Sequence, residues 1–136
     1  MEEAVVIRVQ SNLDSATEAY IAEVVDCGFA IHREVGPGYM ESLYSNAMCV
    51  ELRARAVPFE REKVVCVTYR DQPVGIHRLD LIIRGCIVVE LKAVRAIEPV
   101  HCAQLMAYMK ASGMRVGLLM NFSGGTFKEG VKRLVL

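Results

Sequence analysis

One segment, residues 78–92 (RLDLIIRGCIVVELK), constrains the fold of this chain more than any other. Aliphatic side chains fill both halves and a glycine lies between them, which predicts two antiparallel strands joined by a tight turn. With the turn centred on that glycine, Asp80 faces Glu90 across the strand pair. Arg78 faces Lys92 in the same register, and alternation along the strands puts all four on one face. The opposite face is then apolar and is expected to be buried: Leu79, Leu81, Ile83, Ile87, Val89 and Leu91.

The two opposed acids favour a metal site. Carboxylates directly across a strand pair, with Cβ atoms roughly 5 Å apart, repel each other, and a divalent cation compensates for this repulsion. Mg²⁺ prefers hard oxygen ligands and retains several waters, so Asp80, Glu90 and a backbone carbonyl suit it. Lys92 points to the same side, where it could orient or deprotonate a water or neutralise charge on a phosphoryl group. On these residues alone, an ion-pair cluster on a solvated sheet face explains the pattern equally well.

These residues resemble a known family. Asp80 followed by Glu90-Leu91-Lys92 resembles the D…ExK core of the PD-(D/E)xK nuclease superfamily. Residues 38–44 (GYMESLY) are similar to the GxxExxY pattern that names one small bacterial and archaeal family within it. Leu79 stands where the superfamily name has proline. The resemblance covers about residues 20–135, and its remaining motifs follow in the family's order: HREVGPG at 32–38, ELKAV at 90–94, QLMAY at 104–108 and NF at 121–122.

The resemblance implies a restriction-endonuclease-like core and a nuclease that depends on Mg²⁺ or Mn²⁺. Asp80 and Glu90 would hold the metal, and Lys92 would act on the water. Glu41 is implied to be an additional metal ligand or a residue that positions water, from a helix packed over the acidic face. Without the resemblance, a glutamate in the first turn of a helix is adequately explained by the helix dipole. Tyr44, one turn further, is either its structural or its phosphate-facing companion.

A third helix contributes two more candidates. His101, Gln104 and Tyr108 have i, i+3 and i+7 spacing and therefore form one stripe. Gln104 and Tyr108 resemble the QxxxY motif of RecB-like nucleases, which lies beside the metal site and contacts phosphate or holds the lysine. Spacing alone favours ordinary amphipathic packing, and His101 has the weakest case because a lone histidine is usually structural or at the surface.

Periodicity and capping signals predict an α/β fold with element order ααβββαβ around one mixed four-stranded sheet. Ser15 and Glu18 form a capping box for the first helix, and Pro99 opens the third. The fourth strand follows the third through a helical crossover, so these two strands are expected to be parallel. The expected helices cover residues 15–33, 40–56 and 99–113, with a short last helix at 128–133; the expected strands cover 62–70, 74–84, 86–94 and 114–121, and residues 4–9 are either a short extra strand or a lead-in.

Length and composition indicate one domain and argue against a disulfide-bonded, zinc-binding or membrane protein. The 136 residues suffice for one core, so residues 16–136 are expected to form a single nuclease-like domain after an N-terminal extension at 1–15. The five cysteines show no metal-binding spacing, which indicates reduced core thiols. With no apolar run long enough for a membrane span and no signal peptide, we expect a cytoplasmic protein without membrane contact.

The expected partner is nucleic acid, with DNA favoured over RNA. Because the formal net charge is zero, contact must come from local basic clusters, which are also explained as ordinary solvated surface. The candidates are Arg53, Arg55, Arg61 and Lys63, and Lys128, Lys132 and Arg133. A nuclease this small would need two copies to cut a duplex, so a homodimer is also considered. Two alternatives stay open: a non-catalytic nuclease-fold scaffold, and a metal-dependent enzyme for a small phosphorylated substrate.

Overall fold

The computed structural model describes residues 13–136. The strand considered at residues 4–9 lies outside the described residues. Along the chain the elements are α1 (Ser15–Val35), α2 (Glu41–Ala54), β1 (Phe59–Tyr69), β2 (Gln72–Ile83), β3 (Ile87–Lys92), α3 (Pro99–Ser112), β4 (Val116–Asn121), the 3-10 turn η1 (Lys128–Gly130) and β5 (Val131–Val135).

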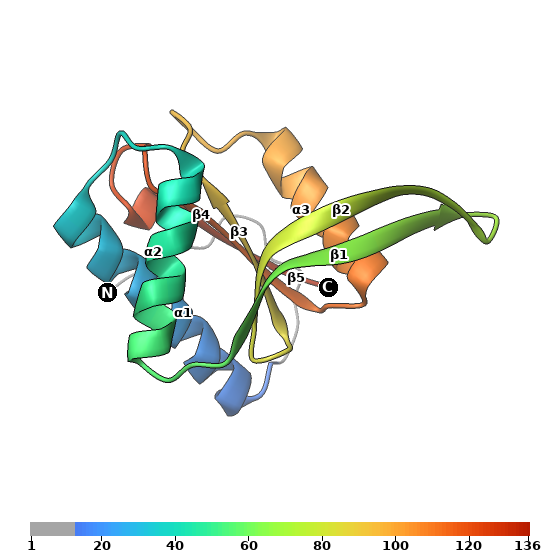
Figure 1. The fold of residues 1–136 in the computed structure, drawn as a ribbon, viewed down its shortest axis with the longest axis horizontal. Helices are drawn as coiled ribbons and strands as arrows, with labels where there is room; N and C mark the ends of the chain where they lie inside the picture. Colours follow the sequence, from blue (N-terminus) through green and yellow to red (C-terminus); the bar gives the residue numbers. More distant parts are fainter. Residues whose placement is uncertain (1–12) are drawn as a thin grey trace.

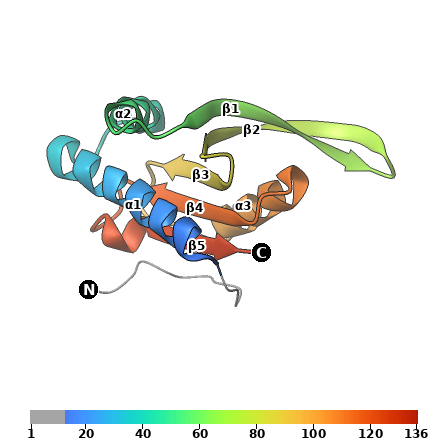
Figure 2. The ribbon, with the colours of Figure 1, turned by 90° about the horizontal axis from the view of Figure 1, so that it is seen from below.

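The strands form one mixed sheet in the order β1-β2-β3-β4-β5. β3 and β4 are parallel and are connected through α3, as predicted, whereas the other neighbouring pairs are antiparallel. Helices α1 and α2 lie on one side of the sheet and α3 on the other (Figures 1 and 2). This architecture confirms the α/β class and is consistent with the restriction-endonuclease-like fold that was expected.

The C-terminal segment differs from the prediction. Instead of a short helix at 128–133, the single turn η1 leads into β5, so the sheet has five strands rather than four. Val131, Leu134 and Val135 are buried against β4 and the helices. Burial of these side chains favours pairing of the segment with β4 over a helix. The polar residues at the start of the segment gave no indication of this strand in the sequence.

The N-cap of the first helix lies one residue earlier than predicted. Asp14 is the N-cap, and its Oδ1 accepts a hydrogen bond of 2.7 Å from the backbone N–H of Thr17. Ser15 is therefore already helical, and the side chain of Glu18 binds the guanidinium of Arg133 on β5 instead of closing a capping box. The predicted start and end of α3 are confirmed: Pro99 is its first residue, and Gly113 caps it with a left-handed φ of 75°.

The register predicted for the acidic hairpin is confirmed over three pairs, Leu81↔Val89, Ile82↔Val88 and Ile83↔Ile87. The prediction of one apolar face is wrong for Leu79. This side chain packs on the α3 side of the sheet with Ile82 and Val88, while Leu81 packs on the α1–α2 side.

The side-chain alternation is therefore interrupted at Asp80. On the neighbouring strand, Glu62 has a left-handed φ of 54°, and the registered pairs step from Arg61↔Leu81 to Lys63↔Leu79 without a pair between Glu62 and Asp80. The β2–β3 ladder also ends before Asp80, so the pair expected between Arg78 and Lys92 is not formed. A local irregularity in two strands lies at the level of the acids.

Beyond this irregularity, β1 and β2 pair with each other as a two-stranded arm, which we define as residues 64–78. The arm extends past the rest of the sheet (Figures 1 and 2). Both of its strands are longer than predicted, and the turn between them consists of Arg70 and Asp71, which have φ values of 50° and 64°.

Candidate active site

Asp80 and Glu90 are bound to each other's strands. The backbone N–H of Asp80 donates a 3.0 Å hydrogen bond to Glu90 Oε2, and the backbone N–H of Leu91 donates a 2.8 Å hydrogen bond to Asp80 Oδ2. These two bonds continue the hairpin where the backbone ladder has ended. The acids thus lie at one level and close together, as the sequence predicted.

Burial places both carboxyl groups under electrostatic strain. Glu90 is only 5% exposed, and desolvation, followed by the nearby charge of Asp80, raises its pKa to about 7. The pKa of Asp80 is also raised, mainly by desolvation, although the hydrogen bond from Leu91 acts in the opposite direction. Glu90 is buried and Asp80 is partly buried. Because the two carboxylates are costly to ionise together, they define a position where positive charge is favoured.

Lys92 and Glu41 share the electrostatic environment of this acid pair. Lys92 is the last residue of β3, and its positive charge lowers the pKa values of Asp80, Glu90 and Glu41. Glu41 is the first residue of α2. Its pKa is raised by partial desolvation of its carboxyl group and then by the charge of Asp80, and the residue as a whole is exposed.

Two further residues near the acids, His77 and Glu62, were not predicted from the sequence. His77 on β2 has Nε2 3.7 Å from Glu90 Oε1, and this buried nitrogen makes no hydrogen bond with the described residues. Burial lowers the pKa of His77. Glu62 on β1 lies close enough for its charge to raise the pKa of Asp80. Regular alternation would place His77 and Asp80 on opposite faces, so only the irregularity at Asp80 brings His77 to Glu90.

Of the predicted stripe on α3, Tyr108 contacts His77, the residue beside Glu90. Its ring stacks on His77 with centroids 3.6 Å apart, and burial, followed by the charge of Glu90, raises its pKa. Gln104 is exposed on the same helix, and no contact places it at the acids. His101 has a capping role, because its Nδ1 accepts a 2.9 Å hydrogen bond from the backbone N–H of Glu98.

Tyr44 is a structural residue in this protein. Its hydroxyl donates a 2.6 Å hydrogen bond to the carbonyl of Gly36 and accepts one from the backbone N–H of Tyr39. The ring is fully buried and stacks on Phe122 with centroids 4.4 Å apart. Tyr44 therefore fixes the turn that leads into α2, and with it the position of Glu41 at the helix start.

Asn121 performs a similar structural role at the end of β3. Its side chain is buried, accepts a 2.9 Å hydrogen bond from the N–H of Val94 and donates one of 2.9 Å to the carbonyl of Val94. In the parallel β3–β4 pair, Asn121 is in register with Lys92. The amide thus holds the backbone that follows Lys92. In the sequence, the only sign of this role is a polar residue at the end of an apolar segment.

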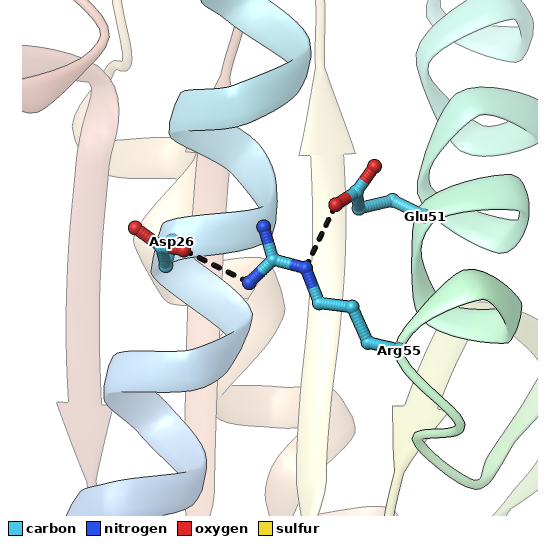
Figure 3. Close-up of polar contacts among 3 residues, drawn as sticks. All are labelled: Asp26, Glu51 and Arg55. Atoms are coloured by element: carbon cyan, nitrogen blue, oxygen red, sulfur yellow. Dashed lines mark hydrogen bonds and ion pairs between the residues drawn. The ribbon is translucent and has the colours of Figure 1, made fainter.

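Two of the basic residues proposed for nucleic-acid contact form ion pairs within the fold. Arg55 binds Asp26 on α1 at 2.8 Å and Glu51 on α2 at 2.7 Å (Figure 3), and these hydrogen bonds raise its pKa. Arg133 forms a two-pronged contact with Glu18. These two arginines join secondary-structure elements, so their side chains are not presented for phosphate binding.

Among the side chains of the candidate site, the carboxylates of Asp80 and Glu90 are the ones suited to bind a hard divalent cation. One oxygen of each carboxylate, Asp80 Oδ1 and Glu90 Oε1, makes no hydrogen bond with residues 13–136. Within the same part of the chain, no group of three or more His, Cys, Asp or Glu side chains is arranged to hold a metal ion. Since Mg²⁺ is commonly bound by one or two carboxylates and several waters, the pair alone is a sufficient protein contribution.

The protein is therefore an α/β protein whose mixed sheet has helices on both sides and carries Asp80 and Glu90 on adjacent strands, with Lys92 after Glu90. The family model described as the PD-(D/E)XK nuclease superfamily matches residues 18–134, and the chain belongs to this superfamily. No curated protein and no solved structure gave a match. No helix in the described part of the chain has the length and apolar character needed to cross a membrane.

Proposed function

We propose that this protein is a metal-dependent phosphodiesterase of the GxxExxY type that cleaves nucleic acid, with DNA as the favoured substrate. The observation that carries the proposal is the Asp80–Glu90 pair, in which each carboxylate accepts a hydrogen bond from a backbone N–H of the opposite strand. Membership of the nuclease superfamily supports hydrolysis of a phosphodiester bond.

In this proposal, Asp80 and Glu90 hold Mg²⁺ or Mn²⁺ through the carboxylate oxygens that make no hydrogen bonds, and Glu41 assists by ordering water. When bound, the cation would supply a water of lowered pKa and offset charge on the phosphoryl group. Lys92 Nζ orients the attacking water or neutralises charge on the phosphoryl oxygens.

Tyr108 and His77 support this arrangement from the α3 side. His77 Nε2 lies 3.7 Å from Glu90 Oε1, and the ring of Tyr108 stacks on the ring of His77, so Tyr108 would hold His77 beside the carboxylate. Gln104 would contact substrate phosphate from the exposed side of α3, as the superfamily resemblance implies.

The test is incubation of the protein with labelled plasmid, linear and single-stranded DNA and with RNA, in Mg²⁺, Mn²⁺ or EDTA. We expect cleavage of at least one DNA substrate with metal, and none with EDTA or with Asp80→Asn. Glu34→Gln, at an exposed position, is the matched control and should cleave like the wild type. Cleavage that persists in Asp80→Asn would contradict the proposed role of the acid pair.

The alternative function is a non-catalytic scaffold that retains the nuclease fold. The occupation of Arg55 and Arg133 by internal ion pairs favours it, since these two candidates for nucleic-acid binding are used to join elements. A scaffold would show no metal-dependent cleavage of any of the four substrates.

A further inference from the structure

Two large apolar side chains are exposed directly before Glu41. Tyr39 is 52% exposed and Met40 is 76% exposed, and they end the turn between α1 and α2. Apolar residues scattered singly over a protein surface need no explanation. These two are adjacent, and the residue that follows them has a carboxyl group whose pKa depends on the charges of Asp80 and Lys92. The Tyr39–Met40 pair therefore lies beside a residue of the candidate active site.

The ring of Tyr39 is anchored although it is exposed. Its backbone N–H donates a 3.3 Å hydrogen bond to the hydroxyl of Tyr44, and its ring packs edge-to-face on the ring of Tyr44 with centroids 6.4 Å apart. Tyr44 is itself buried and stacked on Phe122. An aromatic ring that is already held in place loses little conformational entropy when a flat ligand stacks on it.

The turn that carries Tyr39 is joined to the loops that follow β3 and β4. The backbone N–H of Gly38 donates a 3.3 Å hydrogen bond to Ser123 Oγ. Gly124 lies against the carbonyl oxygen of Arg95, where a Cβ would be 3.4 Å from that oxygen. The three loops lie at one end of the molecule (Figure 1). Because β3 and β4 are parallel, their carboxyl ends meet at this end, where open α/β sheets commonly bind ligands.

Two arginines on these segments are not engaged in the fold. Arg33 lies in the last turn of α1 and Arg95 follows β3, and both are exposed. Neither side chain forms an ion pair or a hydrogen bond within residues 13–136, in contrast to Arg55 and Arg133. A guanidinium group without an internal partner is suited to bind phosphate oxygens.

The combination of side chains indicates the chemistry of the ligand. Proteins that bind single-stranded nucleic acid stack bases on aromatic side chains and hold the backbone with basic groups. Bases in a duplex are stacked on each other, whereas unpaired bases are free to stack on a protein ring. An exposed apolar pair alone would also suit a protein partner, but the two unpaired arginines and the neighbouring acid pair favour nucleic acid.

We propose that the Tyr39–Met40 pair is a stacking platform for an unpaired base of the substrate, and that Arg33 and Arg95 contact the adjacent phosphates. This inference rests on the proposed function and narrows its substrate to single-stranded nucleic acid or to a duplex with unpaired bases. Tyr39 is a substrate-binding residue in this proposal and takes no part in the chemistry at the acids.

The first test measures binding without cleavage. A fluorescently labelled single strand and a duplex of the same sequence are titrated with the full chain in EDTA, and anisotropy is recorded. We expect Tyr39→Ala to lower the affinity for the single strand by about tenfold, the usual loss for one stacked base, and to leave the duplex affinity nearly unchanged. Tyr39→Phe keeps the ring and should bind like the wild type. Tyr69→Ala, at a 68% exposed tyrosine on the arm, is the matched control and should have no effect.

The second test reports stacking directly. The chain contains no tryptophan, so Tyr39→Trp introduces a single indole whose fluorescence should be quenched when a base of the single strand stacks on it. Tyr69→Trp should show no quenching. Arg95→Gln should weaken the binding of the single strand and reduce its salt dependence, because one phosphate contact releases fewer counterions when it is removed.

Three outcomes would overturn the proposal: equal single-strand affinity of Tyr39→Ala and the wild type, fluorescence of Tyr39→Trp that the single strand does not quench, and a dimer in analytical ultracentrifugation that dissociates in Tyr39→Ala. The last result would assign the Tyr39–Met40 pair to a second copy of the chain. Because binding is measured in EDTA, a protein that binds through Tyr39 but never cleaves contradicts only the catalytic proposal. Metal-dependent cleavage with unchanged binding in Tyr39→Ala contradicts only the stacking platform.

Discussion

Asp80 and Glu90 take over the hydrogen bonds of the hairpin where its backbone ladder ends. The N–H of Asp80 donates to Glu90 Oε2, and the N–H of Leu91, the residue after Glu90, donates to Asp80 Oδ2. Each carboxylate thus uses one oxygen to hold the opposite strand and keeps the other free of hydrogen bonds from the described residues. The folded chain itself fixes the separation of the two acids, at the expense of keeping two repelling groups together.

This arrangement predicts that protonation of Glu90 stabilises the protein. The pKa of Glu90 is raised to about 7 in the fold, from 4.5, so the native state retains a proton that the unfolded state releases between these values. Stability contributed by this group is therefore greatest at low pH and falls as pH rises to about 7. From about pH 5 to about pH 8 we expect a loss of about 2–3 kcal/mol.

Urea unfolding of the wild type and of Glu90→Gln across this pH range measures the effect. The variant keeps an oxygen that can accept from Asp80 but carries no charge, so its pH dependence should be flatter and its stability above neutral pH higher. Glu34→Gln should follow the wild type. Equal pH dependence in Glu90→Gln and the wild type would contradict the electrostatic strain inferred here.

Cation binding should relieve the same repulsion. We expect Mg²⁺ or Mn²⁺ to raise the melting temperature of the wild type, because a ligand that binds only the folded state stabilises it in proportion to its saturation. Asp80→Asn should lose the metal-induced increase, and its melting temperature without metal should be unchanged or higher than that of the wild type. Calorimetric titration with Mn²⁺ provides an independent measurement. A wild-type increase that persists in Asp80→Asn would indicate binding elsewhere.

The buried amide of Asn121 should contribute strongly to stability. In Asn121→Ala, the N–H and the carbonyl of Val94 lose their partners, and we expect a cost of about 2–4 kcal/mol in the free energy of unfolding. Ser123→Ala removes one solvent-exposed hydrogen bond of 3.3 Å, from the N–H of Gly38, and should cost well under half as much. Denaturant unfolding of the two variants makes the comparison, and similar losses would show that Asn121 does not clamp the end of β3.

The sequence was sufficient for the parts of the fold that depend on local pattern. Alternating aliphatic residues and Gly85 determine the hairpin register, and Pro99 and Gly113 delimit α3. The side of the sheet on which Leu79 packs could not be predicted. Alternation assumes a regular strand, and both β1 and β2 are irregular at the level of Asp80. His77 was missed for the same reason. The strand β5 was missed because its pairing with β4 depends on contacts between segments distant in sequence.

The candidate site was also predicted only in part from the sequence. Asp80, Glu90 and Lys92 influence one another's charge, and the pKa values of Glu41 and Tyr108 are raised by Asp80 and Glu90, respectively. The pattern alone cannot separate a residue that touches the acids from one that supports the fold. Tyr44 supports the fold, because its hydroxyl donates a hydrogen bond to the carbonyl of Gly36. His101 also supports the fold, because it caps α3.

Lys92 provides the last prediction, which separates a catalytic lysine from an ion-pair partner. Its charge stabilises the ionised forms of Asp80 and Glu90, so either role is compatible with its position. If Lys92 acts on the attacking water, Lys92→Ala should lower the cleavage rate by about a hundredfold or more. Metal affinity should be retained or increased, because a positive charge near the cation has been removed. Lys92→Arg should not restore the rate, since guanidinium stays protonated and has a different shape.

Cleavage and calorimetric Mn²⁺ binding are therefore measured on the same preparations of the wild type, Lys92→Ala and Lys92→Arg. Lys110→Ala is the matched control, because Lys110 is an exposed lysine in the last turn of α3 and should not affect either quantity. A structural lysine would give a different pattern: Lys92→Ala would lose metal binding together with activity, or Lys92→Arg would cleave at the full rate. Either result would assign Lys92 to holding the acid pair in place and would transfer the activation of water to another group.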